Sequence, residues 1–268
     1  MNQKANHLWI PSYQNDTKAR LNLFCFPYAG GTTYVYRQWS QLLPPTVAVY
    51  PIELPGRRKR FQEPPYTNLE ALLADLAIAI LPFLNKPFVF FGHSMGGLIA
   101  FELTRLLRRQ CDISPQHLII SACRATQLPR SKPPIHNLPD AEFQKEIIRL
   151  GGTPQAVLDN SEMMELILPT LRADFAKIET HVYREETPLN IPISVFGGNS
   201  DSEVDREELA AWEKQTTKEF SLTMFEGDHF FIEEKRCDPA DVSYTKERAS
   251  NQRSLMLNRI AGELEKYL

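Results

Sequence analysis

A serine between two glycines is the residue of this chain best placed to act as a nucleophile. Ser94 lies in the segment Gly92-His93-Ser94-Met95-Gly96, which follows the apolar run 87–91 and precedes the helix-like run 98–103. That order predicts a strand, a tight turn and a helix, an arrangement known as a nucleophile elbow. Small residues two before and two after the serine allow a turn sharp enough to expose its Oγ atom. The pattern therefore indicates nucleophilic catalysis by Ser94.

A serine hydroxyl needs a base to remove its proton, and the base needs an acid to orient it. Asp201 follows the predicted strand 193–196, and His229 follows the predicted strand 220–225. In parallel sheets the functional groups gather at the carboxyl ends of the strands. The chain order serine, acid, histidine is that of the α/β-hydrolases. We therefore predict Ser94 as nucleophile, His229 as general base and Asp201 as the acid that holds the imidazole.

Other candidates for the acid and the base are placed less well. Asp205 directly precedes the predicted helix 206–216, where a helix N-cap is the ordinary role of an aspartate. The other histidines lie near the N-terminus, in the elbow itself, at the start of a strand or between residues 126 and 184; they are His7, His93, His117, His136 and His181. His229 remains the predicted base because it follows a late strand.

Attack by a serine also requires two backbone N–H groups that stabilise the negatively charged oxygen of the tetrahedral intermediate. Met95, the residue after the nucleophile, is expected to supply one of them. The other is expected from the glycine-rich loop Pro27-Tyr28-Ala29-Gly30-Gly31, which follows the first clear strand. Within that loop Ala29 is the predicted donor. Without an elbow further along the chain, this loop would be interpreted only as a turn.

The elements that must position these residues alternate along the chain. Six short apolar runs predict strands at 21–26, 46–50, 88–91, 117–121, 193–196 and 220–225. Helical patterns lie in most of the gaps, at 35–43, 68–84, 98–110, 206–216 and 251–268. Short strands alternating with helices predict an α/β fold with a mostly parallel central sheet flanked by helices. Together with the elbow, this pattern predicts an α/β-hydrolase fold.

One interval, about 126–184, interrupts the alternation. It has no strand pattern, and amphipathic stretches predict helices at 140–150, 161–170 and 171–182. Prolines bound it on both sides, Pro129, Pro133 and Pro134 on the entry side and Pro188 and Pro192 on the exit side. We interpret this interval as a helical lid inserted into a single domain that spans residues 1–268. A plain pair of crossover helices is the alternative interpretation.

Composition narrows the classes of function. The chain has 268 residues, 43% of them hydrophobic, and a net charge of −3, which favours neither nucleic acid nor an anionic membrane surface as partner. The N-terminus lacks the pattern of a secretion signal, and the apolar run 69–84 contains charged residues and a proline, unlike a membrane span. Four cysteines are scattered without a Cys-x-x-Cys motif; they are Cys25, Cys111, Cys123 and Cys237. We expect a cytoplasmic protein that needs neither a metal nor a cofactor.

These residues, with several further blocks, resemble the type II thioesterases that accompany nonribosomal peptide and polyketide synthases. The similar blocks are 26–31, Glu53-Leu54-Pro55-Gly56-Arg57-Arg58, 63–65, 92–97, Leu171-Arg172-Ala173-Asp174-Phe175, 179–180, 197–201 and 229–231. The resemblance spans about residues 21–232. The blocks that contain Arg57 and Asp174 are much more specific than the elbow.

The resemblance implies an α/β-hydrolase with a mobile helical lid. It implies hydrolysis of acyl or aminoacyl groups stalled as thioesters on the phosphopantetheine arm of a carrier protein, in the biosynthesis of antibiotics and other secondary metabolites. It assigns the triad to Ser94, Asp201 and His229, and the oxyanion donors to Met95 and Ala29. The chain departs from the family where Asp201 is followed by serine rather than proline.

Two other functions remain open at this point. The same triad would serve a general carboxylesterase or a medium-chain acyl-carrier-protein hydrolase, and a hydrolase fold without activity would serve as a binding protein. Acyl selection is expected in the lid, where Met163, Met164, Leu166, Ile167 and Leu168 either line an acyl pocket or, more simply, pack the lid on the core. The basic run Arg57-Arg58-Lys59-Arg60 is either a solvated loop or a docking surface for an acidic carrier protein.

Overall fold

Six runs of the chain form one parallel sheet with the strand order β2-β1-β3-β4-β5-β6. The structure is a computed structural model that describes residues 8–13, 18–233 and 246–268, without the side chains of 246–252. The strands are β1 (Leu21–Phe26), β2 (Val47–Pro51), β3 (Phe88–His93), β4 (His117–Ser121), β5 (Ile193–Gly198) and β6 (Phe220–Phe225). Every residue of β1, β3, β4 and β5 is buried, as in parallel sheets covered on both faces. The predicted parallel sheet is confirmed.

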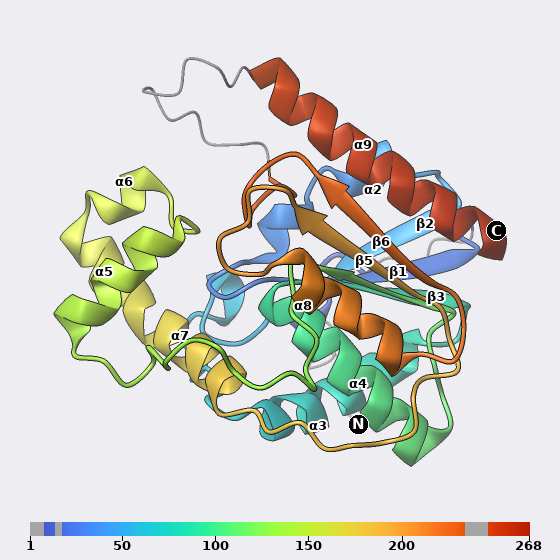
Figure 1. Ribbon diagram of the computed structural model, residues 1–268, viewed down its shortest axis with the longest axis horizontal. Helices are drawn as coiled ribbons and strands as arrows, with labels where there is room; N and C mark the ends of the chain where they lie inside the picture. The colour runs from blue at the N-terminus through green and yellow to red at the C-terminus, as the bar shows by residue number, and fades with distance from the viewer. Residues whose placement is uncertain (1–7, 14–17, 234–245) are drawn as a thin grey trace.

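Helices cover both faces of this sheet (Figure 1). Helices α3 (Leu69–Ile80), α4 (Met95–Cys111) and α8 (Arg206–Ala210) pack on one face, and α2 (Trp39–Leu42) and α9 (Lys246–Leu264) pack on the other. Short 3₁₀ segments complete the layers: η1 (Thr33–Tyr36), η2 (Arg58–Arg60), η3 (Leu81–Phe83), η4 (Ala211–Gln215) and η5 (Glu265–Tyr267). Successive strand residues point to opposite faces, so Phe90 joins the core under α4 and Phe91 joins the core under α2. This is the predicted α/β-hydrolase type of fold.

Three helices lie between β4 and β5 in sequence, beyond the edge to which the arrowheads of β5 and β6 point (Figure 1). They are α5 (Asp140–Leu150), α6 (Gln155–Leu158) and α7 (Ser161–Glu179). The two helices predicted at 161–170 and 171–182 are in fact this single helix α7, which contains Pro169. A proline inside a helix removes one backbone donor. The helix continues through it because residues beyond the proline, including Leu171 and Lys177, are buried against the core.

The expectations about membrane spans and cysteines can be compared with the structure only for the residues that it describes. None of the helices in the described ranges combines the length and hydropathy needed to cross a bilayer. Cys25, Cys111 and Cys123 are free thiols. Cys237, His7 and most of the polar segment after Ile232 lie outside the described residues.

Candidate active site

The turn between β3 and α4 holds Ser94 in a strained backbone conformation. Its φ is 53° and its ψ is −118°, in a region that residues with side chains rarely adopt. A Cβ atom on Gly92 would lie 2.1 Å from the carbonyl oxygen of Gly96, and a Cβ atom on Gly96 would lie 2.0 Å from that of Phe26. Both flanking glycines are therefore required sterically. The turn places Ser94 at the carboxyl end of β3.

Three segments distant in the sequence meet at Ser94. His229 Nε2 lies 2.9 Å from Ser94 Oγ, and His229 Nδ1 lies 2.8 Å from Asp201 Oδ2. These residues follow β3, β6 and β5, three strands whose carboxyl ends lie at the same edge. The structure thus brings together the three residues predicted from the sequence. The chain of contacts can carry a proton from the hydroxyl to the imidazole.

The carboxylate of Asp201 is fully buried and uses both oxygens. While Oδ2 faces the imidazole, Oδ1 accepts hydrogen bonds from the backbone N–H groups of Glu203 at 2.8 Å and Val204 at 3.2 Å. These bonds fix the carboxylate within its own loop. The histidine is therefore oriented with Nε2 toward the serine.

A second histidine packs against the first. The ring centroids of His93 and His229 are 5.5 Å apart, and His93 Nδ1 lies 2.9 Å from Ser121 Oγ. Burial, followed by the nearby charge of His229, lowers the pKa of His93 well below its ordinary value. His93 is therefore neutral at physiological pH. It supports the ring of His229 without adding a charge beside it.

The predicted oxyanion donors line the same cavity as Ser94 and His229. Met95 is the first residue of α4, where backbone N–H groups have no acceptor within the helix. Ala29 lies in the turn after β1, closed by a 2.9 Å bond from the Gly31 N–H to the Tyr28 carbonyl oxygen. The Ala29 N–H has no hydrogen-bond partner among the described residues. Both residues therefore border the cavity that contains Ser94 and His229.

The cavity beside Ser94 has a volume of about 560 Å³ and largely apolar walls. From α7 it is lined by Leu171, Phe175 and Ile178, whose spacing puts them on one face of the helix, and from α5 by Ile147 and Leu150. A second cavity of about 580 Å³ shares Ala29 and Leu171 with the first. The two cavities are therefore neighbours on either side of the glycine-rich loop.

The five residues for which the sequence left open an acyl pocket or, more simply, packing do not line this cavity. Met163 and Leu166 are 48% and 56% exposed, Met164 is buried, and Ile167 faces the second cavity instead. The residues of α7 that do line the cavity begin one turn further along the helix, at Leu171. The side chains of Ile167 and Leu168 pack against the apolar cluster of Phe143, Ile147 and Leu171.

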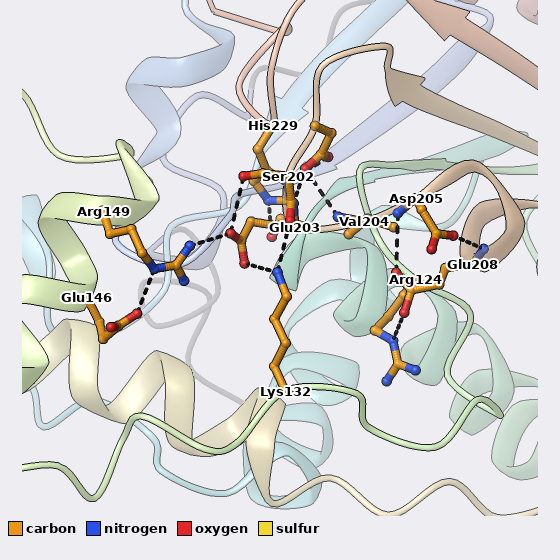
Figure 2. Close-up of polar contacts among 12 residues, drawn as sticks. Arg124, Lys132, Glu146, Arg149, Ser202, Glu203, Val204, Asp205, Glu208 and His229 are labelled. Carbon is orange, nitrogen blue, oxygen red and sulfur yellow. Dashed lines mark hydrogen bonds and ion pairs between the residues drawn. The ribbon is translucent and has the colours of Figure 1, made fainter.

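Glu203, which the sequence analysis missed, connects the loop of Asp201 to the interval 126–184. Its carboxylate accepts hydrogen bonds at 2.8 Å from Lys132 Nζ and at 2.8 Å from Arg149 Nη1 on α5 (Figure 2). Lys132 also donates to the carbonyl oxygen of Ser202 at 3.0 Å. Glu203 also lines the cavity. No local pattern in the sequence marks these pairs.

The remaining candidates have other partners. Asp205 forms a capping box with Glu208 at the start of α8, which confirms its expected N-cap role (Figure 2). His117 lies near Ser194 and Tyr267, His136 near Glu179, and His181 near Glu102. Among the described residues no cluster of histidine, cysteine or acidic groups has the geometry of a metal site.

The basic run 57–60 is not wholly exposed, although its composition is that of a solvated loop. Arg57 and Arg60 are each only 5% exposed, whereas Arg58 and Lys59 lie on the surface. Arg60 pairs with Glu63 and stacks on Trp9. Only half of the run is therefore available to a partner.

The parallel sheet, the serine turn and the order of the residues around it define a serine hydrolase of the α/β-hydrolase type. The model of the thioesterase domain family matches residues 21–240, and the chain belongs to this family. Accordingly, it is a thioester hydrolase.

Relatives and solved structures agree with this family. The chain is 43% identical to the gramicidin S biosynthesis protein GrsT of Aneurinibacillus migulanus over 228 residues, covering 85% of this chain and 89% of that protein. It superposes on the RedJ thioesterase from the prodiginine pathway of Streptomyces coelicolor with a TM-score of 0.81 and 32% identity, covering 97% and 99% of the two chains. For YbtT, the type II thioesterase of the yersiniabactin NRPS/PKS pathway, the TM-score is 0.76 at 29% identity, with 97% of each chain covered.

Proposed function

We propose that this enzyme hydrolyses acyl or aminoacyl thioesters held on the phosphopantetheine arm of carrier proteins, and so clears stalled synthases. The names of its relatives support the substrate class: GrsT belongs to gramicidin S biosynthesis, and YbtT to an NRPS/PKS pathway. The observation that carries the mechanism is the continuous contact from Ser94 through His229 to Asp201.

In the acylation step, His229 Nε2 accepts the Ser94 proton while Oγ attacks the thioester carbonyl carbon. The Met95 and Ala29 N–H groups stabilise the oxyanion of the tetrahedral intermediate. The carbon–sulfur bond then breaks, and His229 returns the proton to the departing thiolate of phosphopantetheine. Asp201 stabilises the imidazolium that exists between these two proton transfers.

In the deacylation step, His229 removes a proton from a water molecule, and the resulting hydroxide attacks the acyl-Ser94 ester. The oxyanion forms again between the same two N–H groups. When it collapses, the carbon–oxygen bond to Ser94 breaks and Oγ takes the proton from His229. The products are a free acid and the original enzyme.

The interval of about residues 126–184 acts in this proposal as the lid of a single hydrolase domain. Its helices α5 and α7 supply much of the apolar wall of the cavity, which suits an acyl chain. The exposed pair Arg58 and Lys59 is the candidate contact for an acidic carrier protein. A cytoplasmic location fits this assignment, since the synthases would be its partners there.

The direct test is intact-mass analysis of a carrier protein loaded with an acyl-phosphopantetheine group. The wild-type enzyme is expected to remove the acyl mass, and Ser94→Ala to slow this by at least about 10⁴-fold, because the nucleophile is lost. Failure of the wild type to unload the carrier, or equal unloading by Ser94→Ala, would refute the proposal.

Two further measurements separate the alternative functions. A carboxylesterase would hydrolyse a matched oxygen ester as fast as the acyl-pantetheine thioester. A binding protein without activity would leave Ser94 unlabelled by a fluorophosphonate. We expect rapid labelling of Ser94 and a clear preference for the thioester.

A further inference from the structure

Two charged segments that play no part in the proton transfer meet beside the glycine-rich loop. Arg57, in the loop after β2, places Nη2 at 2.9 and 3.0 Å from the two carboxylate oxygens of Asp174 on α7. Lys177, one turn further along α7, places Nζ 2.7 Å from Asp174 Oδ1. Asp174 is 0% exposed, Lys177 1% and Arg57 5%. The three side chains form a buried cluster of two cations and one anion.

This cluster is bonded to the backbone of the loop that contains Ala29. Asp174 Oδ2 accepts a 2.8 Å hydrogen bond from the Gly30 N–H, and Arg57 Nη1 donates a 3.0 Å hydrogen bond to the Gly31 carbonyl oxygen. The peptide before Gly30 and the peptide after Gly31 are therefore each hydrogen-bonded to a buried charged side chain. Neither contact involves the hydrogen-bonding groups of Ser94, His229 or Asp201.

The loop is also pressed closely against α7. Gly30 has a φ of +74°, and a Cβ atom there would lie 2.6 Å from Leu171 Cδ2. Leu171 lines the cavity beside Ser94 and lies one turn before Asp174. One face of α7 thus supplies the cavity wall, the contact with Gly30 and the carboxylate that holds its N–H.

Stability alone is a poor reason to bury such a cluster. Desolvating three charges costs several kcal/mol per ion, and apolar side chains of similar volume are often as stabilising. A charged hydrogen bond, however, orients a peptide more strictly than apolar packing does. Burial raises the pKa of Asp174, but the charges of Arg57 and Lys177 outweigh it and hold this pKa below its ordinary value. The acceptor of the Gly30 N–H is therefore a carboxylate at neutral pH.

We propose that Asp174 is a positioning residue for the oxyanion hole. Its carboxylate, held by Arg57 and Lys177, fixes the peptide that follows Ala29 and so keeps the Ala29 N–H directed at the reacting carbonyl oxygen. The inference rests on the proposed function, in which that N–H is an oxyanion donor. It also assigns a role to the segments around Arg57 and Asp174. These two segments are the parts of the sequence that resemble the family most specifically.

The test compares Asp174→Asn with the wild type in catalysis and in the binding of two ligands. An acyl trifluoromethyl ketone adds to Ser94 and forms an oxyanion, whereas the matched acyl thioether binds without reacting. Complete removal of an oxyanion donor costs about 10²–10³ in rate. Because Asp174→Asn misdirects the donor without removing it, we expect kcat to fall by about 10–100-fold with little change in KM. Affinity for the ketone should fall by the same factor and affinity for the thioether should not.

Arg60→Met is the matched control. Arg60 lies in the same segment as Arg57 and is equally buried, but its side chain bonds to Glu63 and to the carbonyl oxygen of Glu53. This variant should lower the melting temperature while leaving kcat and ketone affinity within about two-fold of the wild type. The pH dependence of kcat should be the same in all variants, since His229 and Asp201 are untouched.

Arg57→Lys provides a second, milder variant if Asp174→Asn does not fold. It keeps the charge but loses the paired contact and the bond to Gly31, so we expect a parallel fall of about 3–10-fold in kcat and ketone affinity. Equal losses of ketone and thioether affinity, or the same losses in Arg60→Met, would show a merely structural role and overturn the inference. A wild-type enzyme without turnover would instead refute the proposed function.

Discussion

Ser94 depends on its two neighbouring glycines as well as on His229. Its backbone conformation, with a positive φ, costs of order 1–3 kcal/mol, and the surrounding packing must supply that energy. The close approach of Gly96 to β1 and of Gly92 to the first turn of α4 leaves no room for a side chain at either position. The pattern of glycines around a serine is thus a steric requirement of one turn. In the proposed mechanism this turn presents the hydroxyl that attacks the thioester.

Gly96→Ala should therefore remove the activity of Ser94 without changing any group that takes part in catalysis. The new Cβ atom would lie 2.0 Å from the Phe26 carbonyl oxygen, which forces β1 and the elbow apart. We expect a loss of about 1–3 kcal/mol in the free energy of unfolding, and fluorophosphonate labelling at least about 100-fold slower.

Gly262→Ala in α9 is the matched control, because its Cβ atom would meet nothing within 4 Å. That change should stabilise the protein by about 0.5–1 kcal/mol. Normal labelling in Gly96→Ala would contradict the steric argument.

At the scale of elements, the sequence predicts residues that a local pattern locates. It does not predict contacts between residues that are far apart in the chain. Ser94, Asp201 and His229 each follow a strand, and a local apolar run in the sequence locates each of these strands. Asp174 and Arg57 are 117 residues apart, and nothing local indicates that they meet. The continuity of α7 through Pro169 was missed for the same reason, since distant packing maintains the helix. The apolar wall at Leu171 was not identified from the sequence either, because only the packing of α7 decides which of its apolar residues face the cavity.

Glu203 joins two elements whose relative movement should control access to the cavity. Its partners Lys132 and Arg149 are about half exposed, so each pair contributes only about 0–1 kcal/mol and is weakened by salt. We expect hydrogen exchange in α5 to accelerate by about 2–5-fold in Glu203→Gln at low salt. In the wild type the same acceleration should appear at about 0.5 M salt, where the pairs are screened.

The control for this experiment is Glu219→Gln, which removes a surface pair with Lys266. It should leave exchange in α5 unchanged at any salt concentration. If Glu203→Gln also leaves exchange in α5 unchanged, the pairs do not restrain α5.

At the scale of the whole molecule, one edge of the sheet gathers almost every group that the proposed mechanism uses. The loop after β1 carries Ala29, the turn after β3 carries Ser94, and the loops after β5 and β6 carry Asp201 and His229. Helix α7 crosses this edge and contributes both cavity wall and the Asp174 carboxylate. The residues at the opposite ends of the strands take no part in the proposed mechanism and affect only the stability of the fold. His117, at the start of β4, belongs to that side.

The buried His117 should make the protein sensitive to acid. Burial, opposed by Glu263 and reinforced by Lys266, lowers the pKa of His117 to about 4, and its ring contacts Ser194 and Tyr267. The unfolded chain binds a proton on this residue near pH 6.5, which the folded protein does not bind until about pH 4. The free energy of unfolding therefore falls as the pH drops through this window, by about 2 kcal/mol for this residue between pH 7 and 4.5.

His117→Asn should be less stable than the wild type at pH 7 because it loses ring contacts, yet its stability should fall less on acidification. Urea denaturation at the two pH values measures this difference, with His93 retained in both proteins so that its own contribution cancels. Equal losses in the two proteins would show that His117 is not the acid-sensitive group.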